Sequence, residues 1–199
     1  MQFTEQKFNI GQLEGISAKT IEEHLKLYTG YVKHANLIHE KIQELLNLDP
    51  EKHAYPIAEM QRRFAFEFDG MRNHELYFTQ FEGGAKPAES LVELKKKIES
   101  KWGSFETWFS KFSSLAMTRG VGWAILYFDK KTNQLVHTWI EEQHIGHLTG
   151  LDVILALDMW EHSYMLDYVP SEKKKYIEAF FKNLNWEVVE KRFSDIVSR

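Results

Sequence analysis

Two long helical stretches, separated by one proline break, dominate the first half of this chain. The first is predicted from Ser17, a good N-cap residue, to Leu48, where Asp49-Pro50 stops it. The second is predicted from Pro56 to Phe81 and ends at Gly83-Gly84, because paired glycines punctuate regular structure. The first half is therefore predicted to be an antiparallel helical hairpin.

The second half mixes helical and strand-like patterns. The predicted elements are helices at residues 87–100 and 104–118, strands at 122–128, 134–140 and 153–157 with a turn at 129–133, and a helical segment from 171 with a break near 183–185. The predicted fold class is α+β. A hairpin domain over residues 1–84 precedes a C-terminal domain over residues 85–199, in which helices surround a three-stranded, mostly antiparallel sheet.

Composition excludes several classes of protein. The 43% hydrophobic content is enough for a packed core, and a net charge of -4 without a basic stripe argues against a nucleic-acid partner. No apolar run approaches the roughly 18 residues that span a bilayer, and the start lacks a signal peptide, so we expect no membrane partner and a cytoplasmic location. The chain has no cysteine. Any metal must therefore be held by histidine, aspartate or glutamate.

One segment, Asp158 to Tyr164, combines two acids, a histidine and two aromatic residues directly after an apolar run. Asp158 and His162 are four residues apart, and a helical turn would bring them to one face. One carboxylate oxygen and one imidazole suit a first-row metal such as iron, manganese or zinc. A hydrogen-bonded core pair is the alternative.

Two other histidines lie in patterned surroundings. His24, Tyr28 and Tyr31 share one helix face, which could also be an ordinary amphipathic stripe. His74 follows Gly70 by one turn, and a glycine inside a helix costs about 1 kcal/mol relative to alanine. Something is therefore expected to approach the backbone closely at Gly70, and a helix-crossing contact would serve as well as a ligand.

Together these residues predict a mononuclear metal site of three histidines and one aspartate at the interface of the two halves. Such a site leaves an open position for solvent or a small ligand. The pattern does not choose the reaction.

Several segments in this order resemble the iron/manganese superoxide dismutase family. They are Asn73-His74, Gly103-Ser104-Phe105-Glu106, Gly120-Val121-Gly122-Trp123-Ala124, Asp158-Met159-Trp160-Glu161-His162-Ser163-Tyr164, and residues 183–193, which are similar to the family's N-x-x-N-W-x-x-V-x-x-R-[FY] segment. The resemblance extends over nearly the whole chain from about Ile16.

The resemblance implies disproportionation of superoxide to dioxygen and hydrogen peroxide by one-electron cycling of one manganese or iron ion per subunit. The ligands it implies are His24, His74, Asp158 and His162. Gly70 on the second helix together with Gln143 near the third strand is the manganese-type pattern, so manganese is favoured, although either metal fits the family.

The resemblance also implies roles around the metal. Gln143 would reach the metal-bound solvent and Tyr31 would relay hydrogen bonds from it towards bulk water. Trp123, Trp160 and Phe66 would form an apolar wall. Glu161 would cross a two-fold axis to hold the partner's His162, which makes a homodimer part of the implied mechanism, with a tetramer as a further possibility.

Some positions depart from the family pattern. Tyr28 stands where a gateway histidine is usual, and we expect it to contact Tyr164 across the dimer seam. Lys173-Lys174-Lys175 stands where the family has an arginine at the substrate funnel, which keeps positive charge without the rigid guanidinium. These changes motivate one alternative, a non-catalytic relative that uses the fold as a structural or interaction module. A different metal reaction such as hydrolysis would need a free general base, and no candidate stands out.

Overall fold

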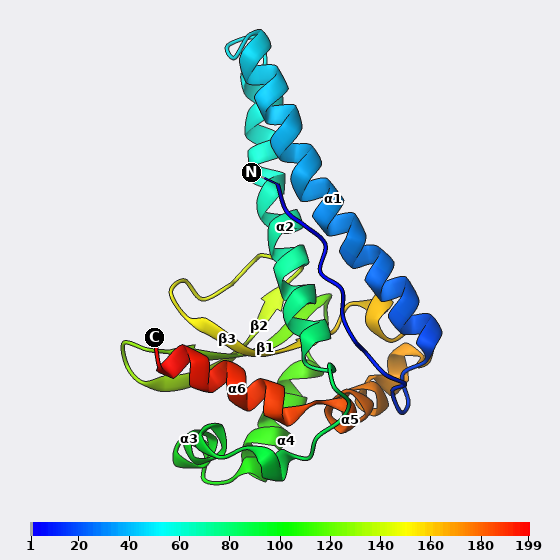
Figure 1. Ribbon diagram of the computed structural model, residues 1–199, viewed down its shortest axis with the longest axis vertical. Coiled ribbons are helices and arrows are strands. Elements are labelled where there is room, and N and C mark those ends of the chain that lie inside the picture. Colours follow the sequence, from blue (N-terminus) through cyan, green and yellow to red (C-terminus); the bar gives the residue numbers. More distant parts are fainter. Residues whose placement is uncertain (1) are drawn as a thin grey trace.

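The long helices of the first half form a hairpin that projects beyond the rest of the molecule (Figure 1). The structure is a computed structural model that describes residues 2–199. Helix α1 spans Ala18–Leu48 and begins where the side chain of Ser17 accepts a hydrogen bond from the backbone N–H of Thr20. Helix α2 spans Ala54–Thr79. The N-cap and both helices confirm the prediction to within two residues at each end.

The sheet has the order β2-β1-β3 with both pairings antiparallel. Its strands are β1 at Gly122–Asp129, β2 at Gln134–Glu141 and β3 at Asp152–Asp158. The central strand β1 is buried along almost its whole length, which explains its continuous apolar run. Its register places Trp123 directly opposite Asp158 at the end of β3.

Helices surround the sheet and complete the predicted α+β class. They are η1 Ala88–Ser90, α3 Glu93–Trp102, α4 Phe105–Ala116, η2 Glu161–Ser163, η3 Pro170–Glu172, α5 Lys173–Asn183 and α6 Trp186–Val197. The break predicted near residues 183–185 is confirmed, because Asn185 caps α6 by accepting a hydrogen bond from the N–H of Glu187. Among residues 2–199, no helix has both the length and the apolar character needed to cross a bilayer.

The hydrophobic core is continuous between the two halves. Tyr77 and Phe81 near the end of α2 pack their rings against Phe180 of α5. The division into domains at residues 84 and 85 stays a prediction, and the two parts share one core across it.

The N-terminal segment runs along the hairpin, as Figure 1 shows in dark blue. The backbone of Phe3 exchanges two hydrogen bonds with the side chain of Asn36, and the backbone N–H of Asn9 donates to Glu82. This segment therefore packs along both α1 and α2 without forming a helix or an extended strand.

Candidate metal centre

Four side chains from four different elements meet where the hairpin contacts the sheet. His24 comes from α1, His74 from α2, Asp158 from the end of β3 and His162 from η2. The Nε2 atoms of the three histidines lie 3.1, 3.6 and 3.3 Å, respectively, from Oδ2 of Asp158. The four potential ligand atoms all lie within 4.8 Å of one another. The structure thus brings together the residues that the sequence grouped from opposite ends of the chain.

Asp158 and His162 meet by a route other than the helical turn considered from their spacing. Asp158 ends a strand, and the chain then turns through the short 3-10 helix η2. The backbone N–H of Trp160 donates to Oδ1 of Asp158 at 2.8 Å. This bond leaves the other carboxylate oxygen, Oδ2, facing the three imidazoles.

The protonation of the cluster suits a metal ion. Burial lowers the pKa of both His24 and His74, so these rings are neutral at neutral pH. Nδ1 of His74 donates to the carbonyl oxygen of Gly70 at 2.6 Å, and its buried Nε2 has no hydrogen-bond partner among the described residues. That nitrogen therefore presents a lone pair to the centre of the cluster.

The carboxylate supplies the negative charge. Burial alone would raise the pKa of Asp158, but His162 and His24 outweigh it and the net shift is downward. A carboxylate with three imidazoles is a donor set typical of first-row transition metals, and the residues present therefore fit an iron or manganese ion.

A glutamine and a tyrosine form a hydrogen-bonded chain beside this cluster. Trp123 donates from Nε1 to Oε1 of Gln143 at 3.0 Å, and Nε2 of Gln143 donates to the hydroxyl of Tyr31 at 3.0 Å. Burial raises the pKa of Tyr31 above its usual range, so its hydroxyl keeps its proton. The ring of Tyr31 packs against Gly70, so the expected close approach there is a helix-crossing contact made by this tyrosine of α1.

Aromatic rings enclose the cluster. Trp123 packs edge-on against His74, Trp160 stacks on His162, and Phe66 contacts both Trp160 and Tyr31. The side chains of His24, His74 and Asp158 are fully buried, whereas that of His162 is 19% exposed. The cluster therefore approaches solvent on the side of His162.

The expected contact of Tyr28 with a partner's Tyr164 is wrong. Tyr28 is fully buried and Tyr164 is 1% exposed within the single chain, so neither offers surface to a partner. The hydroxyl of Tyr28 instead accepts a hydrogen bond from the backbone N–H of Gln6 at 2.8 Å and donates to Glu75 at 3.3 Å. Tyr28 thus anchors the N-terminal segment to the hairpin.

The remaining expected site residues are Glu161, which begins η2, and the lysines at the start of α5. Glu161 is exposed in the single chain, so its side chain is available to a partner subunit. Lys173 places its Nζ 5.7 Å from the ring centroid of Tyr164. The positive charge expected at the funnel therefore lies next to the segment that carries His162.

Two further residues, to which the sequence assigned no role, support the cluster. The backbone carbonyl of Asp158 accepts hydrogen bonds from Ser163 Oγ at 3.1 Å and from the hydroxyl of Tyr176 at 2.9 Å. Ser163 lies inside the motif and could have been found there. Tyr176, in contrast, looks like any buried aromatic residue of a C-terminal helix.

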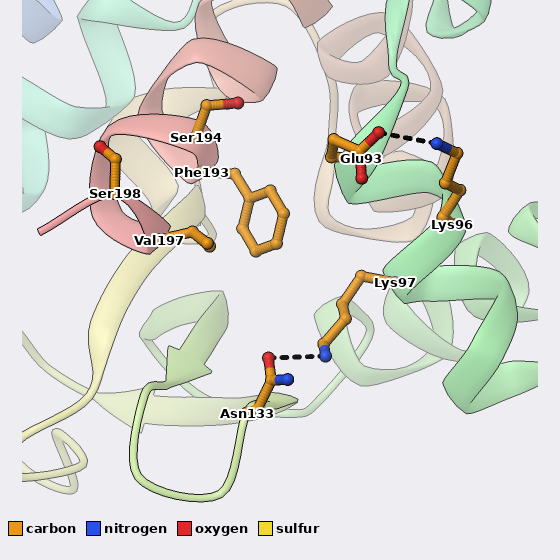
Figure 2. A pocket seen from close by; sticks show the side chains of 8 residues that line it. All are labelled: Glu93, Lys96, Lys97, Asn133, Phe193, Ser194, Val197 and Ser198. Carbon is orange, nitrogen blue, oxygen red and sulfur yellow. Dashed lines mark hydrogen bonds and ion pairs between the residues drawn. The ribbon is translucent and has the colours of Figure 1, made fainter.

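A separate surface pocket of about 450 Å³ opens between α3, α6 and the β1–β2 turn (Figure 2). It shares no residue with the metal-binding cluster. Two of its lysines are already paired, Lys96 with Glu93 and Lys97 with Asn133, each at 2.7 Å. The pocket therefore does not compete with the cluster as the candidate functional site.

Comparisons with known proteins agree with the site. The family described as "Iron/manganese superoxide dismutases, C-terminal domain" matches residues 90–192. An iron superoxide dismutase of Aquifex pyrophilus is 37% identical over 91% of this chain and 85% of its own length. A superoxide dismutase of Aeropyrum pernix named for manganese and iron is 32% identical over 88% of this chain and 81% of its own. A mitochondrial manganese enzyme of Glossina morsitans morsitans is 30% identical over 94% and 86%. This chain belongs to the iron/manganese superoxide dismutase family.

Proposed function

We propose that this protein is a superoxide dismutase, an oxidoreductase that converts two superoxide anions and two protons to one dioxygen and one hydrogen peroxide. The observation that carries the proposal is the convergence of three imidazole nitrogens on Oδ2 of Asp158, none more than 3.6 Å away. Family membership supports the same activity.

His24, His74, Asp158 and His162 would hold one iron or manganese ion. When bound, this ion supplies the one-electron oxidation and reduction that dismutation requires. The protein's own contribution begins with orientation. Gly70 fixes the tautomer of His74, and the backbone N–H of Trp160 fixes the rotation of the Asp158 carboxylate.

Gln143 and Tyr31 would donate and relay hydrogen bonds for proton supply. The amide of Gln143 is held at both ends, because its oxygen accepts from Trp123 and its nitrogen donates to Tyr31. That nitrogen has a second hydrogen, which it would offer to solvent bound by the ion. The Tyr31 hydroxyl accepts from Gln143 and keeps its own proton to donate onwards. Trp123, Trp160 and Phe66 would exclude larger oxidants and ligands.

The metal is proposed to be manganese or iron. Gly70 with Gln143 is the arrangement that favours manganese, whereas the Aquifex relative is named as an iron enzyme. Small differences in hydrogen bonding around the solvent ligand set the balance between these ions. Loading with each metal separately decides between them.

The working form is proposed to be a homodimer. The exposed side chain of Glu161 would reach the partly exposed His162 of the partner subunit and accept a hydrogen bond from its ring, as the family resemblance implies. A tetramer, a cytoplasmic location and the absence of nucleic-acid or membrane partners stay predictions.

The test is superoxide consumption by protein loaded separately with iron and with manganese, with metal content measured in parallel. We expect one ion per chain and activity well above that of an equal concentration of free metal ion for at least one form. A folded protein that binds no stoichiometric metal would favour the alternative of a non-catalytic module. Stoichiometric metal without activity would refute the proposed reaction.

A further inference from the structure

In the loop that follows β2, the side chains of Gln143, His144 and His147 have different surroundings. Gln143 is fully buried and faces Trp123 and Tyr31. His144 packs its ring edge-on against Phe66. His147 turns away from the cluster, towards Tyr127 of β1 and Asn73 of α2. The roles assigned above do not explain His147.

The hydrogen bonds of His147 define its tautomer. The hydroxyl of Tyr127 lies 2.7 Å from Nδ1 of His147. The other ring nitrogen, Nε2, faces the backbone carbonyl oxygen of Gln143, which can only accept, so Nε2 carries a proton and the Tyr127 hydroxyl donates to Nδ1. In the neutral ring the proton of His147 is then on Nε2.

Nε2 of His147 lies 3.2 Å from the backbone carbonyl oxygen of Gln143 and donates to it. The side-chain nitrogen of Asn73 donates to the same oxygen at 2.9 Å. The two donor nitrogens are 3.3 Å apart because they share one acceptor. One carbonyl is therefore held from two directions, by α2 and by its own loop.

We propose that His147 is a positioning residue for Gln143. This inference rests on the proposed function, because the position of the Gln143 amide would matter through the hydrogen bond that it would offer to solvent bound by the ion. Asn73 immediately precedes His74, so one turn of α2 presents a metal-binding imidazole and also holds the glutamine loop. His147 supplies the second hydrogen bond to the backbone carbonyl of Gln143. Tyr127 keeps Nε2 of His147 oriented towards that carbonyl. Groups that orient the surroundings of a metal in this way change its affinity or activity by about 10–100-fold when removed.

A matched pair of substitutions separates positioning from simple packing. In His147→Gln the side-chain nitrogen can occupy the place of Nε2 and still donate, whereas the shorter side chain of His147→Asn cannot reach the carbonyl. His137→Gln is the control, since His137 is a half-buried histidine of β2 that contacts Trp102 and Phe112. Each variant is loaded with metal. Metal content, the visible absorption of the bound ion, its reduction potential and the rate of superoxide consumption are then measured.

We expect His147→Asn to keep its metal but to shift the absorption and the reduction potential, with a turnover about 10–100-fold lower. His147→Gln should restore values close to those of the parent, and His137→Gln should leave them unchanged. Should His147→Asn not fold, Tyr127→Phe replaces it, because it frees the tautomer of His147 without removing the ring. It should shift the absorption and potential in the same direction.

Unchanged absorption and potential in metal-loaded His147→Asn, or in Tyr127→Phe where it stands in, would overturn the proposal. Equal losses in His147→Asn and His147→Gln would also overturn it, because a packing role does not depend on the donor nitrogen. These readouts are independent of turnover. Shifted spectra in a protein without dismutase activity would therefore retain the positioning role and refute only the proposed reaction.

Discussion

The ring of Tyr31 occupies the space that a side chain at Gly70 would take. A Cβ atom built on Gly70 would lie 2.6 Å from Cδ1 and 2.8 Å from Cε1 of that ring. Both atoms are ring carbons in the body of a packed side chain, so they cannot move aside cheaply. The glycine thus allows α1 and α2 to approach closely enough for the Tyr31 hydroxyl to reach Gln143.

Gly70→Ala should therefore lower stability and activity together. Alanine gains about 1 kcal/mol of helix propensity, but overpacking costs about 1–3 kcal/mol, and displacement of Tyr31 lengthens its hydrogen bond to Gln143. Denaturant unfolding and superoxide consumption measure the two effects.

The matched control for this variant is Gly30→Ala on α1, where the added Cβ meets no atom within 4 Å apart from the neighbouring backbone of its own helix. It should gain about 1 kcal/mol and keep its activity. Equal stability and activity of the two variants would contradict the close contact.

His74→Ala should lose the metal. It removes a nitrogen whose buried lone pair has no partner among the described residues. We expect metal affinity to fall by at least about 100-fold, beyond the usual effect of losing a group that only supports a ligand. Elemental analysis after dialysis checks this, and His137→Ala should retain one ion per chain. Full occupancy in His74→Ala would show that the ligand assignment is wrong.

Alkaline pH should destabilise the protein through its tyrosines. Burial is the main cause of a raised pKa in seven of the eight tyrosines, which are Tyr28, Tyr31, Tyr77, Tyr127, Tyr164, Tyr168 and Tyr176. The pKa of Tyr28, for example, rises to about 12. The folded state then keeps protons that the unfolded state releases above about pH 10. Stability is therefore fully present below that pH and falls as the pH rises above it.

Ultraviolet titration of tyrosinate in native and in unfolded protein measures this difference. The native curve should lie at higher pH for most of its amplitude. Coincident native and unfolded curves would contradict the burial of these hydroxyls.

Glu161→Ala tests the proposed dimer. Removing the carboxylate that would hold the partner's His162 should shift the protein towards monomer and lower metal retention. Sedimentation analysis and elemental analysis measure these effects, with Glu99→Ala, an exposed change on α3, as the control. A parent protein that sediments as a monomer at all concentrations would reject the dimer.

The order of the helices and strands was predictable because the residues that end helices, and the spacing of apolar residues, are local features of the sequence. Asp49-Pro50 and Gly83-Gly84 follow the two long helices, and the continuous apolar run of β1 matches its burial. The grouping of His24 with Asp158 was also predictable, although 134 residues separate them. It depended on residue types that have few other reasons to occur together in a core.

What could not be predicted depends on how distant side chains pack. The position of Tyr28 on the face of His24 followed from helical spacing, but its partner did not. That partner is the backbone N–H of Gln6, in a segment whose apolar residues show no helical or strand periodicity. Tyr176 and Arg192 are similar cases, since they donate to the backbone carbonyls of Asp158 and Ile154, and only the assembled fold brings those carbonyls to them.

The most direct measurement of the central claim is the yield of both products when catalytic amounts of metal-loaded protein consume superoxide. Dismutation predicts one dioxygen and one hydrogen peroxide for every two superoxide anions, with no other electron donor consumed. Peroxide formed without dioxygen, at the expense of an added reductant, would instead show a superoxide reductase and contradict the account.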